Sequence, residues 1–329
     1  MGPLFIADFH THYADPAYPA LPPRNTARSL ADRWDALARR IADLDGLLAE
    51  SGRHGVDLRV LSAPPALVTP HGERTRPGDL RRLNDHLAGA VAAAPARLAG
   101  LATVDAFGGE AAAEEAVRAV RDLGLSGLVV DCATEGRLLS DAAARPTLRA
   151  AAELGVPVFA HPVSPDLLTA AFAGLDRFGT SLARGTVNAA ALLSLLADGV
   201  LAELPGLHVV FPMLGVAGLA LAAATDEGEI LTPRAAPPSR AHVYVDTMGY
   251  APAAIRFATD LLGADHVLAG GDWPIAARDT TRARVETALA AARLDAAEAR
   301  LVAGGNALRL LRRQPSSDGT GLSGRHTPG

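Results

Sequence analysis

Short apolar segments of strand type alternate with amphipathic helical segments along almost the whole chain of 329 residues. Eight segments have the length and the apolar character of buried strands, and they span residues 4–12, 56–61, 98–104, 127–131, 156–160, 207–211, 242–246 and 266–270. Strands that alternate with helices pair in parallel, and eight parallel strands are enough to close into a barrel. The pattern therefore predicts a single-domain α/β fold, the (β/α)8 TIM barrel.

Residues with helical periodicity fill the intervals between these strands. The expected helices span residues 29–48, 80–93, 110–123, 142–154, 188–204, 215–224, 252–262, 280–291 and 296–311. An open, doubly wound sheet is the competing arrangement, but no Gly-x-Gly-x-x-Gly sequence follows the first strand, so a dinucleotide site is unsupported. We expect the barrel to span residues 1–312, and the Ser-, Gly- and Pro-rich residues 313–329 to form a disordered tail.

Composition and charge exclude several classes of protein. The formal net charge is −5 and the pI is about 6.1, so the sequence gives no sign of the clustered basic surface that nucleic-acid binding needs. Polar residues interrupt the long apolar stretches, and we expect neither a membrane span nor a secretory signal. The single cysteine, Cys132, excludes an intrachain disulfide and a cysteine-built zinc site; it fits a packed residue in a reducing cytoplasm. The high Ala and Arg content is typical of a GC-rich bacterial genome.

Residues that can bind a metal ion follow three of the predicted strands. The first strand ends in His10 and His12, a spacing that puts both imidazoles on the same face of a strand. His161 follows the fifth strand, and Asp272 follows the eighth. In a (β/α)8 barrel the carboxyl ends of the strands meet at the mouth, so we expect these side chains to converge there. Three imidazoles and one carboxylate around an open position are typical of a catalytic metal site.

Each of these residues also has an ordinary structural explanation when it is considered alone. His-x-His occurs by chance at polar strand ends, His161 can cap a segment before Pro162, and Asp272 can be the N-cap of a helix. His54 is predicted to be a solvated loop residue rather than a ligand. The occurrence of four candidate ligands at strand ends favours the metal site.

Three motifs resemble those of the amidohydrolase-related family. They are residues 10–12 with the sequence HTH, residues 157–162 with the sequence PVFAHP, and residues 270–274 with the sequence GGDWP. The resemblance covers about residues 4–312, and further matches lie at residues 55–57, 60–62, 83–85 and 305–307. The family includes aminocarboxymuconate semialdehyde decarboxylase, resorcylate-type decarboxylases and assorted hydrolases.

The resemblance implies a barrel that carries one divalent metal ion, usually zinc and sometimes manganese. The implied ligands are His10, His12, His161 and Asp272. It also implies a small-molecule substrate. Dimers are common in the family, so a homodimer is an expected assembly.

One position departs from the family pattern. After the sixth strand the family normally carries a histidine that moves protons at the metal-bound water, and alignment places Met213 there. A thioether can neither accept nor deliver a proton at neutral pH. His208 lies near the opposite end of that strand and does not easily replace it. Either the reaction needs no such histidine, or another residue supplies the proton, or the site no longer turns over.

Non-hydrolytic decarboxylation of a small organic acid is the function that the sequence favours. Hydrolysis needs a base for the attacking water, and losing a general base typically costs roughly 10²- to 10⁴-fold in rate. In decarboxylation a metal polarises a neighbouring oxygen, and Asp272 can act catalytically by protonating carbon. An apolar Met213 also suits an aromatic or polyketide-like acid. An amide or lactone hydrolase and a catalytically impaired ligand-binding relative remain the alternatives.

Arg40, Met213 and Trp273 are the predicted substrate-binding residues. Arginine forks usually clamp substrate carboxylates. Arg40 is favoured because its surroundings, residues 34–41, resemble the substrate-arginine region of the family. The other arginines expected on the mouth side, each more typical of a surface position, are Arg24, Arg74, Arg76, Arg177 and Arg184.

Overall fold

Eight parallel strands form one continuous sheet in the computed structural model, and they follow one another in sequence order. They are β1 (Ala7–His12), β2 (Leu58–Ser62), β3 (Leu98–Thr103), β4 (Gly127–Asp131), β7 (Pro157–His161), β8 (His208–Phe211), β9 (Val243–Asp246) and β10 (Val267–Leu268). Each falls inside, or extends one residue beyond, a segment predicted from the apolar pattern. The structure describes the chain except for residues 1–2, 24–27, 226–241, 277–278, 316–321 and 324–329.

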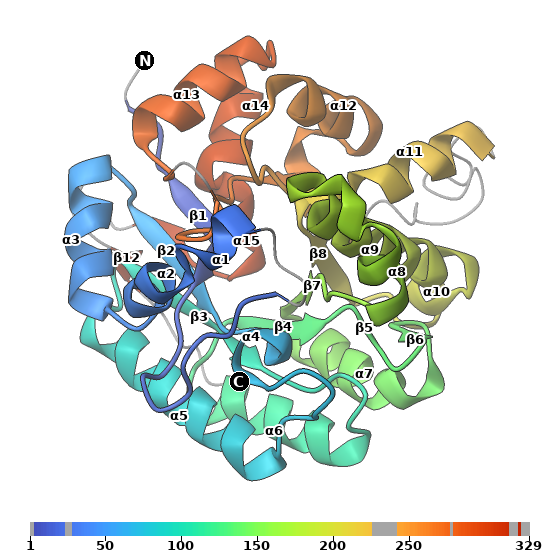
Figure 1. Cartoon of the computed structure of the whole chain (residues 1–329). Helices are drawn as coiled ribbons and strands as arrows, with labels where there is room; N and C mark the ends of the chain where they lie inside the picture. Colours follow the sequence, from blue (N-terminus) through green and yellow to red (C-terminus); the bar gives the residue numbers. More distant parts are fainter. Residues whose placement is uncertain (1–2, 24–27, 226–241, 277–278, 316–321, 324–329) are drawn as a thin grey trace.

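The sheet closes on itself between its first and last strands. The backbone N–H of Phe9 donates to the carbonyl of Ala269 at 2.8 Å, and that of His12 donates to the carbonyl of Trp273 at 2.8 Å. Thr11 and Trp273 also form a parallel bridge. Figure 1 shows the strands as a ring at the centre with the helices around it. The predicted (β/α)8 barrel is confirmed.

Apolar side chains fill the inside of this ring. The interior cluster contains Ala7, Phe9, Leu58, Val60, Ala99, Leu101, Val129, Phe159, Val210, Tyr244 and Leu268, none of them more than 1% exposed. Alternate residues of the strands, such as Leu61 and Val209, face outward and pack beneath the helices. The short helix α15 (Asn306–Leu310) packs against the interior cluster. The barrel is therefore a packed core, and room for chemistry is left at its mouth.

Helices cover the outside of the ring (Figure 1). The longer ones are α2 (Trp34–Ile41), α3 (Leu44–His54), α5 (Pro77–Ala93), α6 (Glu110–Arg121), α7 (Arg145–Leu154), α9 (Arg177–Ala197), α11 (Val216–Thr225), α12 (Pro252–Leu262) and α13 (Arg282–Ala291). The shorter ones are α1 (Arg28–Ala31), α4 (Pro65–Val68), α8 (Asp166–Ala171), α10 (Val200–Glu203) and α14 (Ala296–Arg300). A small hairpin, β5 (Ala133–Thr134) with β6 (Arg137–Leu138), follows β4.

The helix before β8 differs from the prediction. The sequence predicts a helix over residues 188–204, whereas α9 begins at Arg177 and ends at Ala197. Gly199, with a φ of 69°, adopts the left-handed conformation and separates α9 from α10. The early start escapes the pattern because Gly179 and Gly185 lower helix propensity in that stretch. Residues 177–187 thus belong to a helix rather than to a loop.

The predicted closing helix over residues 296–311 is also interrupted. It consists of α14, a π-helical turn (Leu301–Gly305) and α15. A Cβ at Gly304 would lie 2.6 Å from the carbonyl oxygen of Phe5. The lack of a side chain at Gly304 therefore lets this backbone pack directly on the chain that leads into β1.

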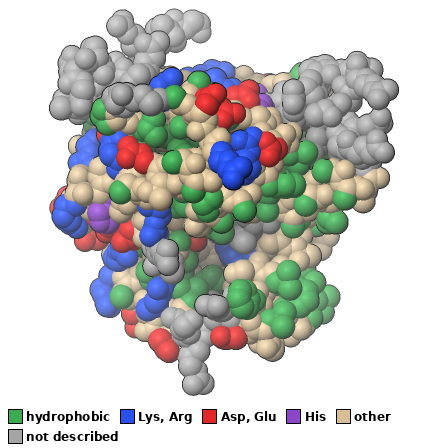
Figure 2. All heavy atoms as spheres, turned by 90° about the horizontal axis from the view of Figure 1, so that it is seen from above, with side chains coloured by type: hydrophobic (Ala, Val, Ile, Leu, Met, Phe, Trp, Pro, Cys, Tyr) green, Lys and Arg blue, Asp and Glu red, His purple; other side chains and the backbone are tan. Residues whose placement is uncertain are grey.

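The described carboxyl-terminal residues and the charged surface give no indication of a functional site. Most of the predicted tail, residues 313–329, lies outside the described residues, and within it Gln314–Pro315 pairs with Leu322–Ser323 in antiparallel fashion. Of the helices that the structure describes, none combines the length and the apolarity needed to cross a membrane. Figure 2 shows acidic and basic side chains interspersed over one face of the molecule. The site therefore has to be sought at the barrel mouth.

Candidate metal centre

Three histidines from two strands meet at the carboxyl ends of the strands. His10 and His12 come from β1, and His161 is the last residue of β7. All three are buried, and each offers a ring nitrogen within 4.8 Å of those of the others. Their ring centroids are 5.1, 5.2 and 5.8 Å apart. The structure thus brings together three of the residues predicted as metal ligands.

An irregularity in β1 turns its two imidazoles towards the interior. Phe9 belongs to the interior cluster, so strict alternation would point Thr11 inward and turn His10 and His12 away. Just before Thr11, β1 carries one residue more than its partner β2. Such a bulge reverses the alternation, a device common beside active sites. The His10 ring consequently contacts the interior Phe159, with 4.8 Å between ring centroids.

Asp272 brings a carboxylate to the histidines from the segment after β10. Its Oδ1 lies 3.1 Å from Nε2 of His12 and 3.4 Å from Nε2 of His10. The φ of Asp272 is 56°, a left-handed conformation that Asp adopts more readily than most residues. The preceding Gly271 leaves no room for a side chain, since a Cβ there would lie 1.8 Å from Oγ1 of Thr280. This Gly-Asp turn aims the carboxylate at the imidazoles.

One nitrogen of each histidine has no hydrogen-bond partner among the residues that the structure describes. These buried atoms are Nε2 of His10, Nδ1 of His12 and Nδ1 of His161. A buried polar atom without a partner costs about 1–3 kcal/mol, so one on each of three neighbouring imidazoles is unusual. Three imidazoles with the Asp272 carboxylate form a donor set that suits zinc and other divalent transition metals. The side chains present therefore fit a single divalent metal ion.

Asp246, the last residue of β9, orients His10. Its Oδ2 lies 2.7 Å from Nδ1 of His10, and its Oδ1 accepts the backbone N–H groups of Met213 and Met248, each at 2.9 Å. A carboxylate on one ring nitrogen leaves the other, Nε2, to face the site, as is usual for histidines that bind metals. Asp246 is not among the residues predicted from the sequence. Asp246 nevertheless lies at the end of a strand, and the same signal led to the prediction of Asp272. That signal could therefore have identified Asp246 as well.

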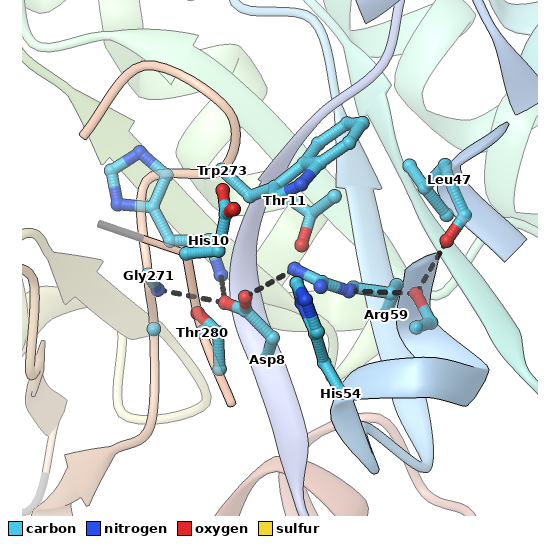
Figure 3. Close-up of polar contacts among 12 residues, drawn as sticks. Asp8, His10, Thr11, Leu47, His54, Arg59, Gly271, Trp273 and Thr280 are labelled. Atoms are coloured by element: carbon cyan, nitrogen blue, oxygen red, sulfur yellow. Dashed lines mark hydrogen bonds and ion pairs between the residues drawn. The ribbon is translucent and has the colours of Figure 1, made fainter. Parts of the chain in front are cut away.

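A second buried carboxylate, that of Asp8, joins the two segments that carry ligands (Figure 3). Its Oδ1 accepts the backbone N–H of Gly271 at 2.8 Å and that of His10 at 3.2 Å. Its Oδ2 lies 2.6 Å from Nη1 of Arg59, and both residues are at most 1% exposed. Nε of Arg59 in turn donates to Oγ of Ser51 at 3.1 Å. This network fixes the backbone at both ligand segments, and no local sequence signal points to it, because its members are distant in the chain.

Burial and neighbouring charges divide the three imidazoles into two kinds. Burial and the Arg184 guanidinium hold the pKa of His161 well below its usual value. Burial also lowers the pKa of His12, although a hydrogen bond to a carboxylate opposes it. Burial acts in the same direction on His10, but the nearby carboxylates, that of Asp246 first, outweigh it and raise the pKa of His10. His12 and His161 are therefore neutral at pH 7, the form that binds metals, whereas His10 holds its proton more strongly.

The three predicted substrate-binding residues lie in different surroundings. Trp273 is 2% exposed, and its Nε1 donates to Oε1 of Glu50 at 2.6 Å. Nη2 of Arg40 lies 2.9 Å from Glu50 and 3.1 Å from Asp279, and its guanidinium lies 5.2 Å from the centroid of the Trp273 ring. Met213 is 8% exposed within an apolar cluster. Their roles towards substrate stay predictions.

Among the other arginines expected at the mouth, Arg184 of α9 stands out. Its charge contributes to the lowered pKa of His161. Arg74, in contrast, is exposed and lies 2.6 Å from the carboxylate of Asp105. Arg24 lies outside the described residues. The arginine whose charge acts on a candidate metal ligand is thus Arg184, whereas the sequence favours Arg40.

Cys132 and the second group of potential metal ligands have structural rather than catalytic explanations. Burial raises the pKa of the Cys132 thiol to about 11, so this residue is protonated at neutral pH and packed. His54 forms a second group of potential metal ligands with Glu50 and Asp279. Arg40 already pairs with both of those carboxylates and occupies the place that a cation would take.

Comparison with known proteins decides the family. A family model described as Amidohydrolase matches residues 7–313. The chain belongs to the amidohydrolase family.

Named relatives of this amidohydrolase are decarboxylases. It is 27% identical over 249 residues to a 2-amino-3-carboxymuconate-6-semialdehyde decarboxylase from Dictyostelium discoideum, covering 70% of this chain and 67% of the relative. It is 31% identical over 195 residues to a gamma-resorcylate decarboxylase from Rhodococcus jostii (strain RHA1), covering 55% of this chain and 59% of the relative. The crystal structure of a dihydroxybenzoic acid decarboxylase from Polaromonas sp. JS666, with bound manganese and the inhibitor 2-nitroresorcinol, superimposes with a TM-score of 0.74 at 23% identity and covers 95% of this chain and 97% of that one.

Proposed function

We propose that this amidohydrolase is a metal-dependent decarboxylase of small aromatic or enol-type acids, which breaks a C–C bond without adding water. The observation that carries the proposal is the buried cluster of His10, His12 and His161, each with an unpartnered ring nitrogen. The carboxylate of Asp272 lies beside them. The names of the related decarboxylases support the same reaction class.

A single divalent ion held by His10, His12, His161 and Asp272 completes the proposed site. When bound, such an ion supplies Lewis-acid polarisation of a substrate oxygen next to the scissile bond. Zinc is the ion that the sequence resemblance favours, whereas the Polaromonas decarboxylase contains manganese. Both ions accept imidazole and carboxylate ligands. Loading the metal-free protein with each ion in turn and measuring turnover decides between them.

Asp272 moves the proton in this proposal. Burial acts to raise its pKa, but the imidazoles of His10 and His12 outweigh it and lower the pKa of Asp272. The carboxylate is therefore ionised at first and can accept a proton from a hydroxyl of the substrate. It then delivers that proton to the ring carbon, the C–C bond breaks, and the carboxylate leaves as CO₂. The Asp272 side chain is 18% exposed, which leaves it accessible to a bound acid.

Met213 argues against hydrolysis at this site. Hydrolysis needs a group that accepts the proton of the attacking water, and the thioether of Met213 does not. Decarboxylation has no attacking water and makes no such demand. The backbone N–H of Met213 still serves the site, because it donates to Asp246. An amide or lactone hydrolase and a catalytically impaired relative are therefore less well supported.

Isotope labelling tests the proposed reaction. Metal-loaded protein is incubated with 2,6-dihydroxybenzoate and other ortho-hydroxy aromatic acids in H₂¹⁸O, and CO₂ and products are measured by mass spectrometry. We expect one CO₂ for each product molecule and no ¹⁸O in the product. Entry of ¹⁸O would instead identify a hydrolase. Tight binding without any product, together with activity gained by Met213→His, would identify an impaired relative.

We further propose that the protein acts in the cytoplasm as a homodimer. Cys132 is unpaired and buried, as suits a reducing compartment. Exposed apolar side chains gather on α8 and α9, where Leu167 is 86%, Phe178 64% and Leu182 45% exposed. Such a patch is typical of a surface that another chain covers. Sedimentation of the purified protein measures the oligomeric state.

A further inference from the structure

Arg184 is a partly buried cation on which the carboxylates of Asp272 and Asp131 act without a direct ion pair among the described residues. Among the residues that the structure describes, none forms an ion pair or a hydrogen bond with its guanidinium. Burial lowers the pKa of Arg184, as expected for a charge that water solvates poorly. Buried charges in folded proteins are normally paired, because an uncompensated one is strongly destabilising. An unpaired guanidinium in such a position therefore needs an explanation.

The place of Arg184 in the fold is set by α9. One turn further along this helix, the buried Asn188 donates from Nδ2 to the carbonyl oxygen of Ala160 at 3.0 Å. Ala160 immediately precedes His161, so the hydrogen bond anchors α9 against the carboxyl end of β7. Residues four apart lie on the same face of a helix, and long side chains lean towards its amino-terminal end. Arg184 is consequently held on the face of α9 that covers the metal centre.

Electrostatics and space agree with that placement. The charge of Arg184 acts to lower the pKa of Asp272 and the pKa of His161, so the guanidinium lies near both residues. A cavity of about 540 Å³ reaches the same helix, and its lining includes Val187 of α9 and Asp131 of β4. A volume of this size suits a small organic ligand. Asp131 is the neighbour of His161 in the register of β4 and β7, so one wall of the cavity lies next to the strand end that carries His161.

We propose that Arg184 binds the carboxylate of the substrate and thereby selects anionic acids at this metal centre. The inference rests on the proposed function for the identity of the anion, and on the position and the charge of Arg184 for the presence of an anion site. A guanidinium offers two parallel N–H donors to one carboxylate, which fixes the orientation of the acid as well as its charge. Since that carboxylate loses its charge as CO₂ forms, the ion pair stabilises the bound substrate more than the transition state. Arg184 is therefore a specificity-determining residue rather than a catalytic one.

Ligand binding to metal-free protein tests the anion site without relying on turnover. The probes are 2,6-dihydroxybenzoate and resorcinol, which differ only by the carboxylate, and binding is measured by calorimetry. We expect the wild-type protein to prefer the carboxylate, and Arg184→Gln to weaken its binding by about 10- to 100-fold while leaving resorcinol unchanged. Arg184→Lys keeps the charge but not the fork, so it should fall between the two. Arg76→Gln, at an exposed position on the mouth side, is the control and should bind both probes as the wild type does.

The stability of the ligand-free protein gives a second, independent reading. Because the unpaired charge is a cost to the fold, Arg184→Gln should raise the melting temperature by about 1–3 °C. A structural arginine would give the opposite sign. Addition of 2,6-dihydroxybenzoate should then raise the melting temperature of the wild type but not that of the variant.

Turnover separates this inference from the proposed function. If decarboxylation is observed, Arg184→Gln should raise KM by about 10- to 100-fold and change kcat much less. If no decarboxylation is observed, the proposed function fails, and the binding and stability measurements still decide the role of Arg184. A wild-type protein that binds 2,6-dihydroxybenzoate no better than resorcinol, or a variant with a lower melting temperature and unchanged binding, would overturn the inference.

Discussion

Two arginines beside the same barrel mouth have opposite surroundings. Arg59 is 1% exposed and lies 2.6 Å from Asp8, and its Nε donates to Ser51. Arg184 comes from α9, and it has neither an ion pair nor a hydrogen bond within the described part of the chain. The two residues carry the same side chain, so the difference lies in what the fold places around each. The paired charge of Arg59 holds the backbone in place, whereas we propose that the unpaired charge of Arg184 binds a ligand.

The two ring nitrogens of His10 show the same contrast between a paired and an unpaired group. Nδ1 of His10 is paired with Asp246 at 2.7 Å, while its Nε2 has no hydrogen-bond partner among the described residues. The paired nitrogen fixes the ring, and the other nitrogen is left for a ligand. The site is therefore built from unsatisfied groups that are held rigidly by satisfied ones.

Removal of an unsatisfied group should have the largest effect. His161→Asn deletes a proposed metal ligand, so we expect stoichiometric metal to be lost and turnover to fall by roughly 10³-fold or more. Metal content is measured by elemental analysis of the purified variant. His54→Asn, in the second ligand group, is the control and should keep its metal. Full metal content in His161→Asn would contradict the site.

Removal of a satisfied group should act on stability instead. Arg59→Met leaves the buried Asp8 carboxylate without its partner, and we expect a loss of about 3–5 kcal/mol in the free energy of unfolding, measured in urea. Adding Asp8→Asn to that variant should restore part of the loss. The exposed pair of Arg74 and Asp105 is the matched control, and Arg74→Gln should cost about 1 kcal/mol or less. An equal loss in both arginine variants would remove the distinction between the buried and the exposed ion pair.

The carboxylate behind His10 should have an intermediate effect. Asp246→Asn keeps the shape of the side chain but weakens its hold on the imidazole, so we expect metal affinity to fall by about 10- to 100-fold. Competition with a chelator of known affinity measures this change. Unaltered affinity would mean that the backbone alone orients His10.

Metal binding should also depend on pH through the same residue. The neighbouring carboxylates raise the pKa of His10 above its usual value, so a proton must leave when the metal binds. Metal affinity should therefore fall as the pH falls below that pKa, by up to about tenfold per pH unit, while His12 and His161 with lowered pKa values add no dependence near neutrality. Calorimetry in two buffers of different ionisation enthalpy counts the protons. Binding at pH 6–7 without proton release would show that His10 is already neutral.

The smallest effect is expected at Met213. Its backbone N–H, not its thioether, contacts Asp246, so Met213→Leu should change kcat/KM by about threefold or less. Steady-state kinetics of the metal-loaded variant measures this. A larger loss would give the sulfur a role of its own in the reaction.

The general plan of the molecule could be predicted from local sequence. Apolar segments of strand length predict the strands, because burial on both faces requires apolar residues throughout a parallel strand. All four proposed ligands lie at, or within two residues of, the carboxyl end of a predicted strand. Barrel geometry brings these strand ends together. His10, His12, His161 and Asp272 were therefore accessible to prediction, and the structure places them side by side.

The details that make the site work depend on contacts between distant segments. The bulge before Thr11, which turns His10 and His12 inward, follows from the register between β1 and β2 and leaves no trace in composition. The supports of the ligands are equally non-local, since Asp8 meets Arg59 across 51 positions and Asp246 meets His10 across 236.

The arginines show the same division most clearly. By sequence, Arg40 is the favoured partner for a substrate carboxylate; in the fold its Nη2 is taken up by Glu50 and Asp279. In the sequence, nothing distinguishes Arg184 from a surface arginine. In the structure, α9 is anchored beside β7 and holds Arg184 near the candidate ligands. The sequence by itself determined the barrel and the candidate ligand set, since these follow from the types of residue and their spacing. Only the tertiary structure decided which polar groups are satisfied, because pairing depends on what the folded chain brings within a few ångströms.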